Sequence, residues 1–192
     1  MEERPQDGAA SPLVAGIYAN LHAYYRFLGR APQVELYNSP SLRWICTGLP
    51  DPFLNTVFAA WLSSTAVAEA IATTVTHFMG QQAPLLWLVE PSTQPPDLGR
   101  HLLAAGLQYT MRSSSMAADL STLPAEVSPL SDLRIEPVDT PARLQQWLAP
   151  YTVGFGLTAY RAGCGAIEMA LGLHPALPRR HYVGLLKVRT VQ

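Results

Sequence analysis

The stretch Leu85-Leu86-Trp87-Leu88-Val89, which lies between two prolines, decides the fold class because it is a solid apolar run of strand length. A run without polar alternation is typical of a strand that is buried on both faces. In the segment 96–109 that follows, Leu98 and Leu102 predict a short helix that ends at Gly106. A buried strand that leads into a helix indicates an α/β fold.

Upstream of this stretch, the pattern alternates between helix and strand. The clearest amphipathic helix begins at Ser11-Pro12 and ends before Gly29 and Pro32. Ser63-Ser64 is typical of the cap of a second helix. The segments predicted here are strands over Val34–Tyr37, Leu42–Thr47 and Phe53–Ala60, of which the last could also be helical, a helix over Thr65–Met79, and a strand over Met111–Leu120.

Residues 123–131 hold two prolines and two serines and form the best linker, so we expect a protease to cut near Ser131 first. After it, Leu133–Val138 alternates like a half-buried strand. The pair Thr140-Pro141 opens a helix that is expected to end near Ala149, with Leu144, Trp147 and Leu148 facing inward. A helix over Ala166–Leu173 and a final strand over His181–Val188 complete the chain.

Composition limits the function classes. The 192 residues are 48% hydrophobic and 14% charged, which indicates apolar surface that meets a partner or further sequence. The 13 basic and 14 acidic residues nearly cancel, so nucleic acid is not expected as a partner. No apolar run approaches the roughly 20 residues of a membrane span, and the polar start is unlike a secretory signal. A soluble, cytoplasmic protein is expected.

The two cysteines do not indicate a metal site, because neither has a Cys or His companion at ligand spacing. Cys46 lies in a strand-like run and is expected to be a small buried hydrophobe. Cys164, between two glycines, is the better candidate for a reactive thiol, but no base is near it in sequence.

Several segments resemble bacterial acyltransferases of the GNAT superfamily (acyl-CoA N-acyltransferases). From Leu133 onward the order is strand, helix, helix, strand, with Trp147 on the first helix, then Gly154-Phe155-Gly156 and Arg180-His181-Tyr182-Val183-Gly184. Before the linker, three sequence segments are similar to the C-terminal half of a degenerate GNAT unit, in which a helix, a glycine and a strand follow one another. They are Trp87-Leu88-Val89-x-Pro91-Ser92, then Leu98-Gly99-x-x-Leu102 with Gly106-Leu107, then Met116-x-x-Asp119-Leu120.

The resemblance implies a GNAT-like mixed sheet with flanking helices, divided into a tail (1–10), a degenerate N-terminal lobe (11–122), the linker (123–131) and the truncated start of a second unit (132–192). Family members bind the pyrophosphate of acetyl-CoA in an Arg/Gln-x-x-Gly-x-Gly/Ala loop that opens a helix. The one formal match, Arg26-Phe27-Leu28-Gly29-Arg30-Ala31, lies at a predicted helix end, where the dipole repels phosphate. Arg26 and Arg30 are therefore interpreted as partners of the helix dipole.

Without the donor loop, neither a bound cofactor nor micromolar binding of acetyl-CoA is expected, and no catalytic residue is assigned. The resemblance implies acyl transfer from acetyl-CoA to an amine in a complete member, with Trp147, Phe155 and Tyr160 as candidate substrate-binding residues. Tyr160 and Glu168 are the titratable groups near that pocket, but packing and a solvated helix face explain them more simply. The alternative is a non-catalytic interaction or small-molecule-binding module.

The final strand suggests an assembly. Val183, Leu185, Leu186 and Val188 are apolar, and a strand at a sheet edge offers unpaired backbone groups. Either the first lobe covers this edge or a second copy of the chain pairs with it. A homodimer through the C-terminal strand is favoured, and a Leu185→Lys change is expected to disrupt it.

Overall fold

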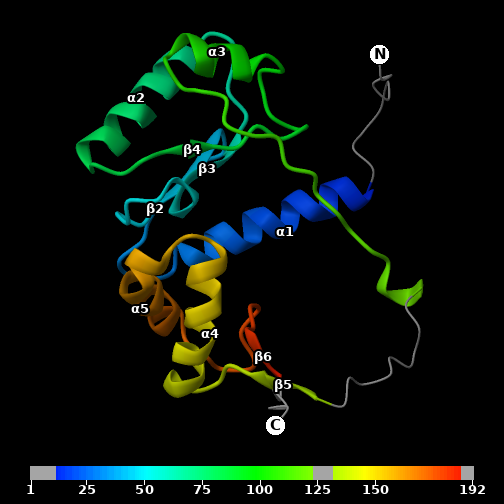
Figure 1. The fold of residues 1–192 in the computed structure, drawn as a ribbon. Helices are drawn as coiled ribbons and strands as arrows, with labels where there is room; N and C mark the ends of the chain where they lie inside the picture. The colour runs from blue at the N-terminus through cyan, green and yellow to red at the C-terminus, as the bar shows by residue number, and fades with distance from the viewer. Residues whose placement is uncertain (1–11, 123–131, 187–192) are drawn as a thin grey trace. The chain divides into compact units, whose positions relative to one another are not determined.

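The computed structural model describes residues 12–122 and 132–186, and the chain divides into two compact units (Figure 1). Unit 1 contains the residues up to Arg26 and Glu35–Ala118, and unit 2 contains Phe27–Val34 and the residues from Asp119 on. The tail at 1–10, the linker at 123–131 with its expected cleavage at Ser131, and Val188 lie outside the described residues. The division at 11–122 and 132–192 stays a prediction.

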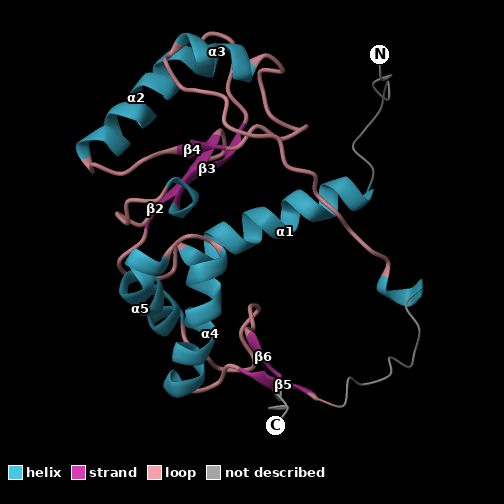
Figure 2. Ribbon diagram, in the orientation of Figure 1, coloured by secondary structure: helices cyan, strands magenta, loops and turns pink. Residues whose placement is uncertain are grey.

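Unit 1 is built on a four-stranded mixed sheet in the order β1-β2-β3-β4 (Figure 2). The first three strands pair antiparallel, whereas β4 pairs parallel with β3. This sheet with its helices confirms the α/β class and the mixed sheet that the sequence predicts. The elements are α1 (Pro12–Leu28), β1 (Glu35–Asn38), β2 (Leu42–Cys46), β3 (Asn55–Ala60), α2 (Val67–Gly80), β4 (Leu86–Trp87) and α3 (Leu98–Ala104).

Strand β3 is the centre of the core of unit 1, and all six of its residues are buried. Val57 belongs to one buried cluster with Ile71 and Phe78 of α2 and Leu98 of α3, and the three-and-four spacing of α2 predicts its part of that cluster. Asn55, at the start of β3, holds the preceding loop: its Oδ1 accepts from the Thr47 backbone N–H, and its Nδ2 donates to two backbone carbonyls of that loop. The loop therefore has its polar groups paired where it enters the core.

Two strand predictions in unit 1 are wrong in extent or in kind. The run 85–89 forms a strand over Leu86–Trp87 alone, and Val89 is exposed, so this run is not buried on both faces. The predicted strand Met111–Leu120 is irregular and exposed until a 3₁₀ turn begins at Leu120. Three successive serines at 113–115 interrupt its apolar pattern, which leaves no continuous face to bury.

The first part of the predicted strand Phe53–Ala60 is also different, because a 3₁₀ turn over Pro52–Leu54 precedes β3. The side chain of Asp51 caps this turn by accepting from the Phe53 N–H. Helix α2 begins two residues later than expected. Ser63 still contributes, since its hydroxyl accepts from the Ala66 N–H in the turn before the helix.

Unit 2 pairs two helices with a two-stranded antiparallel sheet. Its elements are β5 (Leu133–Pro137), α4 (Pro141–Gly154), α5 (Arg161–Leu171) and β6 (Tyr182–Leu186), with 3₁₀ turns at Leu120–Thr122 and Thr158–Tyr160. The predicted start of α4 is confirmed: Thr140 is the N-cap, its hydroxyl accepts from the Arg143 N–H, and Pro141 is the first helical residue. Leu144 and Leu148 are buried as expected.

The ends of the two helices differ from the sequence prediction. Helix α4 does not end near Ala149 but continues through Pro150 to Gly154, and Trp147 is half-buried rather than inward. Proline removes one helical N–H, which an exposed position such as 150 tolerates. Helix α5 begins at Arg161, well before the expected Ala166. A Cβ on Gly165 would lie 2.9 Å from the buried Leu148 Cδ1, so this glycine allows α5 to approach α4 closely.

Candidate functional site

Unit 2 contains a cavity of about 310 Å³ between the end of β5, the segment after α5 and the start of β6. This volume lies at the lower end of the range for small-molecule sites. The charged or titratable side chains that line it are Asp139, His174, Arg179, Arg180 and His181, with the ring of Tyr182 beside them. Asp139 and Arg180 have no charged or hydrogen-bonding partner within the described ranges.

One wall of the cavity is fixed by Glu168 of α5. Its Oε2 forms an ion pair with Arg179 and lies 3.1 Å from His181 Nε2. The ring of Trp147 packs against the imidazole of His181 with 4.0 Å between centroids, and the Arg179 guanidinium lies over the ring of Phe27. Because Arg179 and His181 are held in this way, Asp139 and Arg180 are the charges left to meet a ligand.

Glu168 corrects an interpretation from sequence. It is buried, at 7% exposure, and is not a solvated helix face. Buried carboxylates are normally paired, as this one is. Its two partners follow 11 and 13 residues later, beyond α5, so helical spacing alone gave no signal for the cluster.

The predicted substrate-binding residues do not line the cavity. Trp147 lies behind it, in contact with His181 and stacked on Tyr151. Phe155 is 68% exposed and touches the ring of Tyr151, while Tyr160 is half-buried in the 3₁₀ turn before α5. The rings of Trp147 and Phe155 thus both contact the ring of Tyr151. Their role as ligand contacts stays a prediction.

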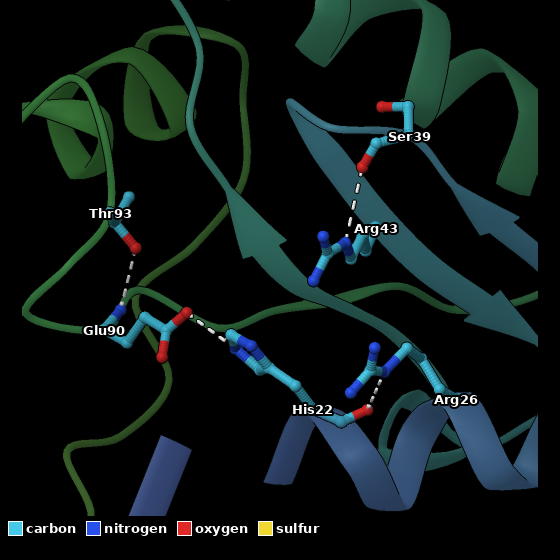
Figure 3. A network of polar contacts seen from close by, with 6 residues as sticks. All are labelled: His22, Arg26, Ser39, Arg43, Glu90 and Thr93. Atoms are coloured by element: carbon cyan, nitrogen blue, oxygen red, sulfur yellow. Dashed lines mark hydrogen bonds and ion pairs between the residues drawn. The ribbon is translucent and has the colours of Figure 1, made fainter. Parts of the chain in front are cut away.

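Unit 1 contains a second group of functional interest, in which His22 of α1 meets Glu90 from the segment after β4 (Figure 3). His22 Nε2 and Glu90 Oε1 are 2.8 Å apart, and the side chain of Glu90 is 3% exposed. Burial raises the pKa of Glu90 above its ordinary value, although the charge and hydrogen bond of His22 act in the opposite direction. The second oxygen of Glu90, Oε2, is sealed from solvent and has no partner.

Neither cysteine offers a reactive thiol at the surface. Cys46 is buried, as the sequence predicts, and burial raises the pKa of its thiol. Cys164 is buried on α5 as well. Within the described residues, no three His, Cys, Asp or Glu side chains are arranged to hold a metal ion, and no helix is long and apolar enough to span a membrane.

The formal donor-loop match at residues 26–31 has the geometry of a helix end. Arg26 lies in the last turn of α1, and its Nε donates to the carbonyl oxygen of His22. The Arg30 guanidinium lies over the ring of Phe27. Arg26 thus lies where the sequence predicts, beside carbonyl groups and not beside free N–H donors.

Comparisons of the chain with protein-family models, with curated proteins and with solved structures found no match.

Proposed function

We propose that this chain is a small-molecule-binding module on a scaffold of GNAT type, and that the cavity of unit 2 is its binding site. The observation that carries the proposal is the pair of opposite, unpartnered charges in that cavity, Asp139 and Arg180. A guanidinium binds a carboxylate through two parallel hydrogen bonds, and a carboxylate accepts from an ammonium group. The ligand class that uses both is a small zwitterion, such as a free amino acid.

The experiment is a titration that is monitored by ligand-observed NMR. The ligands are free amino acids, their amides and the corresponding decarboxylated amines. We expect free amino acids to bind best. Arg180→Gln should lower the affinity for free amino acids about tenfold or more, because a hydrogen bond to a charged group contributes about 1.5–3 kcal/mol. The affinity for the amines should not change. Asp139→Asn should weaken the amines instead. If neither substitution changes any affinity, the cavity is not the site.

Acyl transfer from acetyl-CoA to an amine is the second candidate, and an ammonium group held at Asp139 would suit it. The described residues favour weak donor binding, because their connections from a strand to an α-helix, at 61–66, 88–97 and 138–140, contain no glycine. The same titration therefore includes acetyl-CoA, for which no micromolar binding is expected. Release of free CoA in the presence of an amino acid would favour the transferase.

We also propose that the chain forms a homodimer through its last strand. On one face of the β5–β6 sheet, Ile135 is 64% and Leu186 is 67% exposed, whereas Val183 on the other face is buried. Among the described residues no further strand pairs with β5 or β6, and an exposed apolar sheet face next to such edges favours pairing with a second copy. Leu185 is half-buried on the inner face, which makes Ile135 the cleaner position to change.

Ile135→Lys is expected to convert the dimer to a monomer at tens of micromolar protein, as measured by sedimentation velocity. The substitution places a charge in the apolar face without touching the buried one. Exposed Val153→Lys on α4 serves as the matched control and should leave the dimer intact. A monomer of the unmodified chain at that concentration would contradict the proposal.

A further inference from the structure

The His22–Glu90 pair of unit 1 has the geometry of a carboxylate that orients an imidazole. The backbone of Glu90 is fixed by two hydrogen bonds to Thr93: its N–H donates to the Thr93 hydroxyl, and its carbonyl oxygen accepts from the Thr93 N–H. The imidazole is held from the sides, with Phe58 and Trp61 each at 5.8 Å between ring centroids. Neither partner can turn away without disturbing buried neighbours.

Such an arrangement fixes the tautomer of the histidine. A carboxylate oxygen 2.8 Å from Nε2 favours the proton on Nε2 and leaves Nδ1 with a free lone pair. Among the described residues, two fully buried side-chain polar atoms have no hydrogen-bond partner: Trp87 Nε1 and Glu90 Oε2. His22 Nδ1 does not belong to this group. The imidazole keeps 11% of its side-chain surface. Nδ1 is therefore the ring nitrogen that Glu90 does not engage and that can accept a proton.

A cationic side chain also contacts the ring of Trp61. The Arg43 guanidinium is 5.0 Å from the centre of the Trp61 ring. Its Nε donates to the Ser39 carbonyl oxygen (Figure 3). These two contacts fix the plane of the guanidinium and leave its two terminal nitrogens without an acceptor among the described residues. A planar, oriented guanidinium is suited to an anionic group.

We propose that His22, Glu90 and Arg43 form a general-base site for a small molecule that carries an anionic group and an acidic O–H or N–H. Arg43 binds the anion, and His22 Nδ1 takes the proton while its electron pair stays on the donor atom. The resulting imidazolium keeps its proton on Nε2 and donates it in a hydrogen bond to Glu90. The negative charge of Glu90 balances the positive charge of the ring. Trp61 contacts both His22 and Arg43 and supplies the apolar surface of the site.

The competing explanation is that the pair simply ties α1 to the segment after β4. Both explanations predict a loss of stability when the pair is broken, so stability does not separate them. They differ in the reactivity of Nδ1: a structural tie needs no nucleophilic nitrogen at the surface, whereas a general base requires one.

The test is alkylation of the native full chain by iodoacetate, which carries an anion, and by neutral iodoacetamide. In both reactions the histidine lone pair forms a nitrogen–carbon bond and iodide leaves. We expect iodoacetate to modify His22 at Nδ1 about tenfold faster than His77, although His77 is more exposed and also lies beside a carboxylate, Glu35. Peptide mass mapping measures the rates, and ¹⁵N NMR assigns the alkylated nitrogen.

Two variants separate the roles of the partners. Glu90→Gln keeps the size and an acceptor oxygen, and should slow alkylation of His22 by both reagents. Arg43→Gln should slow iodoacetate alone, while exposed Arg100→Gln on α3 should change neither rate. If His22 reacts no faster than His77 in the unmodified chain, or if Glu90→Gln leaves its rate unchanged, the pair is a structural tie and the proposal is overturned.

Discussion

His22→Ala is expected to lower the free energy of unfolding by about 3–5 kcal/mol at about pH 7.5, because it leaves the Glu90 carboxylate buried without its partner. The loss should become smaller as the pH falls toward about 5. Removing His22 removes the two effects that lower the pKa of Glu90, so burial raises that pKa further. The folded variant then binds a proton that the unfolded chain releases, and its stability decreases as the pH rises.

Urea unfolding at several pH values measures this slope. The matched control is the double variant His22→Ala with Glu90→Leu, which replaces the charge by an apolar side chain and should recover much of the stability at high pH. A single variant whose loss is the same at both pH values would show that the cost arises from lost packing against Phe58 and Trp61, and not from the carboxylate.

The sequence predicts those elements whose signal is local. Helix α1 follows from apolar residues at three- and four-residue intervals, and its end follows from Gly29 and Pro32. The end of α3 is equally readable, because Gly106 adopts a positive φ of 89°, which a glycine accommodates without strain. The start of α4 at Thr140-Pro141 is local in the same sense.

What the sequence does not predict depends on distant partners. His22 and Glu90 are 68 residues apart, and no spacing rule joins a helix residue to a residue that follows a strand. Glu168 resembles an exposed helix residue until Arg179 and His181 are placed beside it. Pro150 would normally end a helix, but α4 continues past it, with Leu148 and Thr152 on either side buried in the fold. The cavity residues Asp139 and Arg180 likewise lie in connections that have no periodicity.

Phe58→Ala is expected to lower the stability of unit 1 about as much as His22→Ala does. Phe58 lies on the fully buried strand β3, is 1% exposed, and stacks on Tyr25 of α1 with 5.0 Å between ring centroids. Truncating a buried phenylalanine costs about 3–5 kcal/mol, since both the transfer free energy and the contacts around the resulting cavity are lost. The ring also packs against His22, so its removal loosens the imidazole that Glu90 orients.

Two further variants test whether the loss of stability comes from the burial of Phe58 or from the shape of its side chain. Phe53→Ala removes the same atoms from a residue that is 52% exposed on the turn before β3, and should cost less than about 1 kcal/mol. Phe58→Leu retains most of the volume and should lose less stability than Phe58→Ala. Urea unfolding gives the three values, and hydrogen exchange in α1 reports the local effect. Equal losses for Phe58→Ala and Phe53→Ala would contradict the placement of Phe58 between α1 and the sheet. If exchange in α1 rises for Phe58→Ala but not for Phe53→Ala, this ring holds the helix that carries His22 against β3.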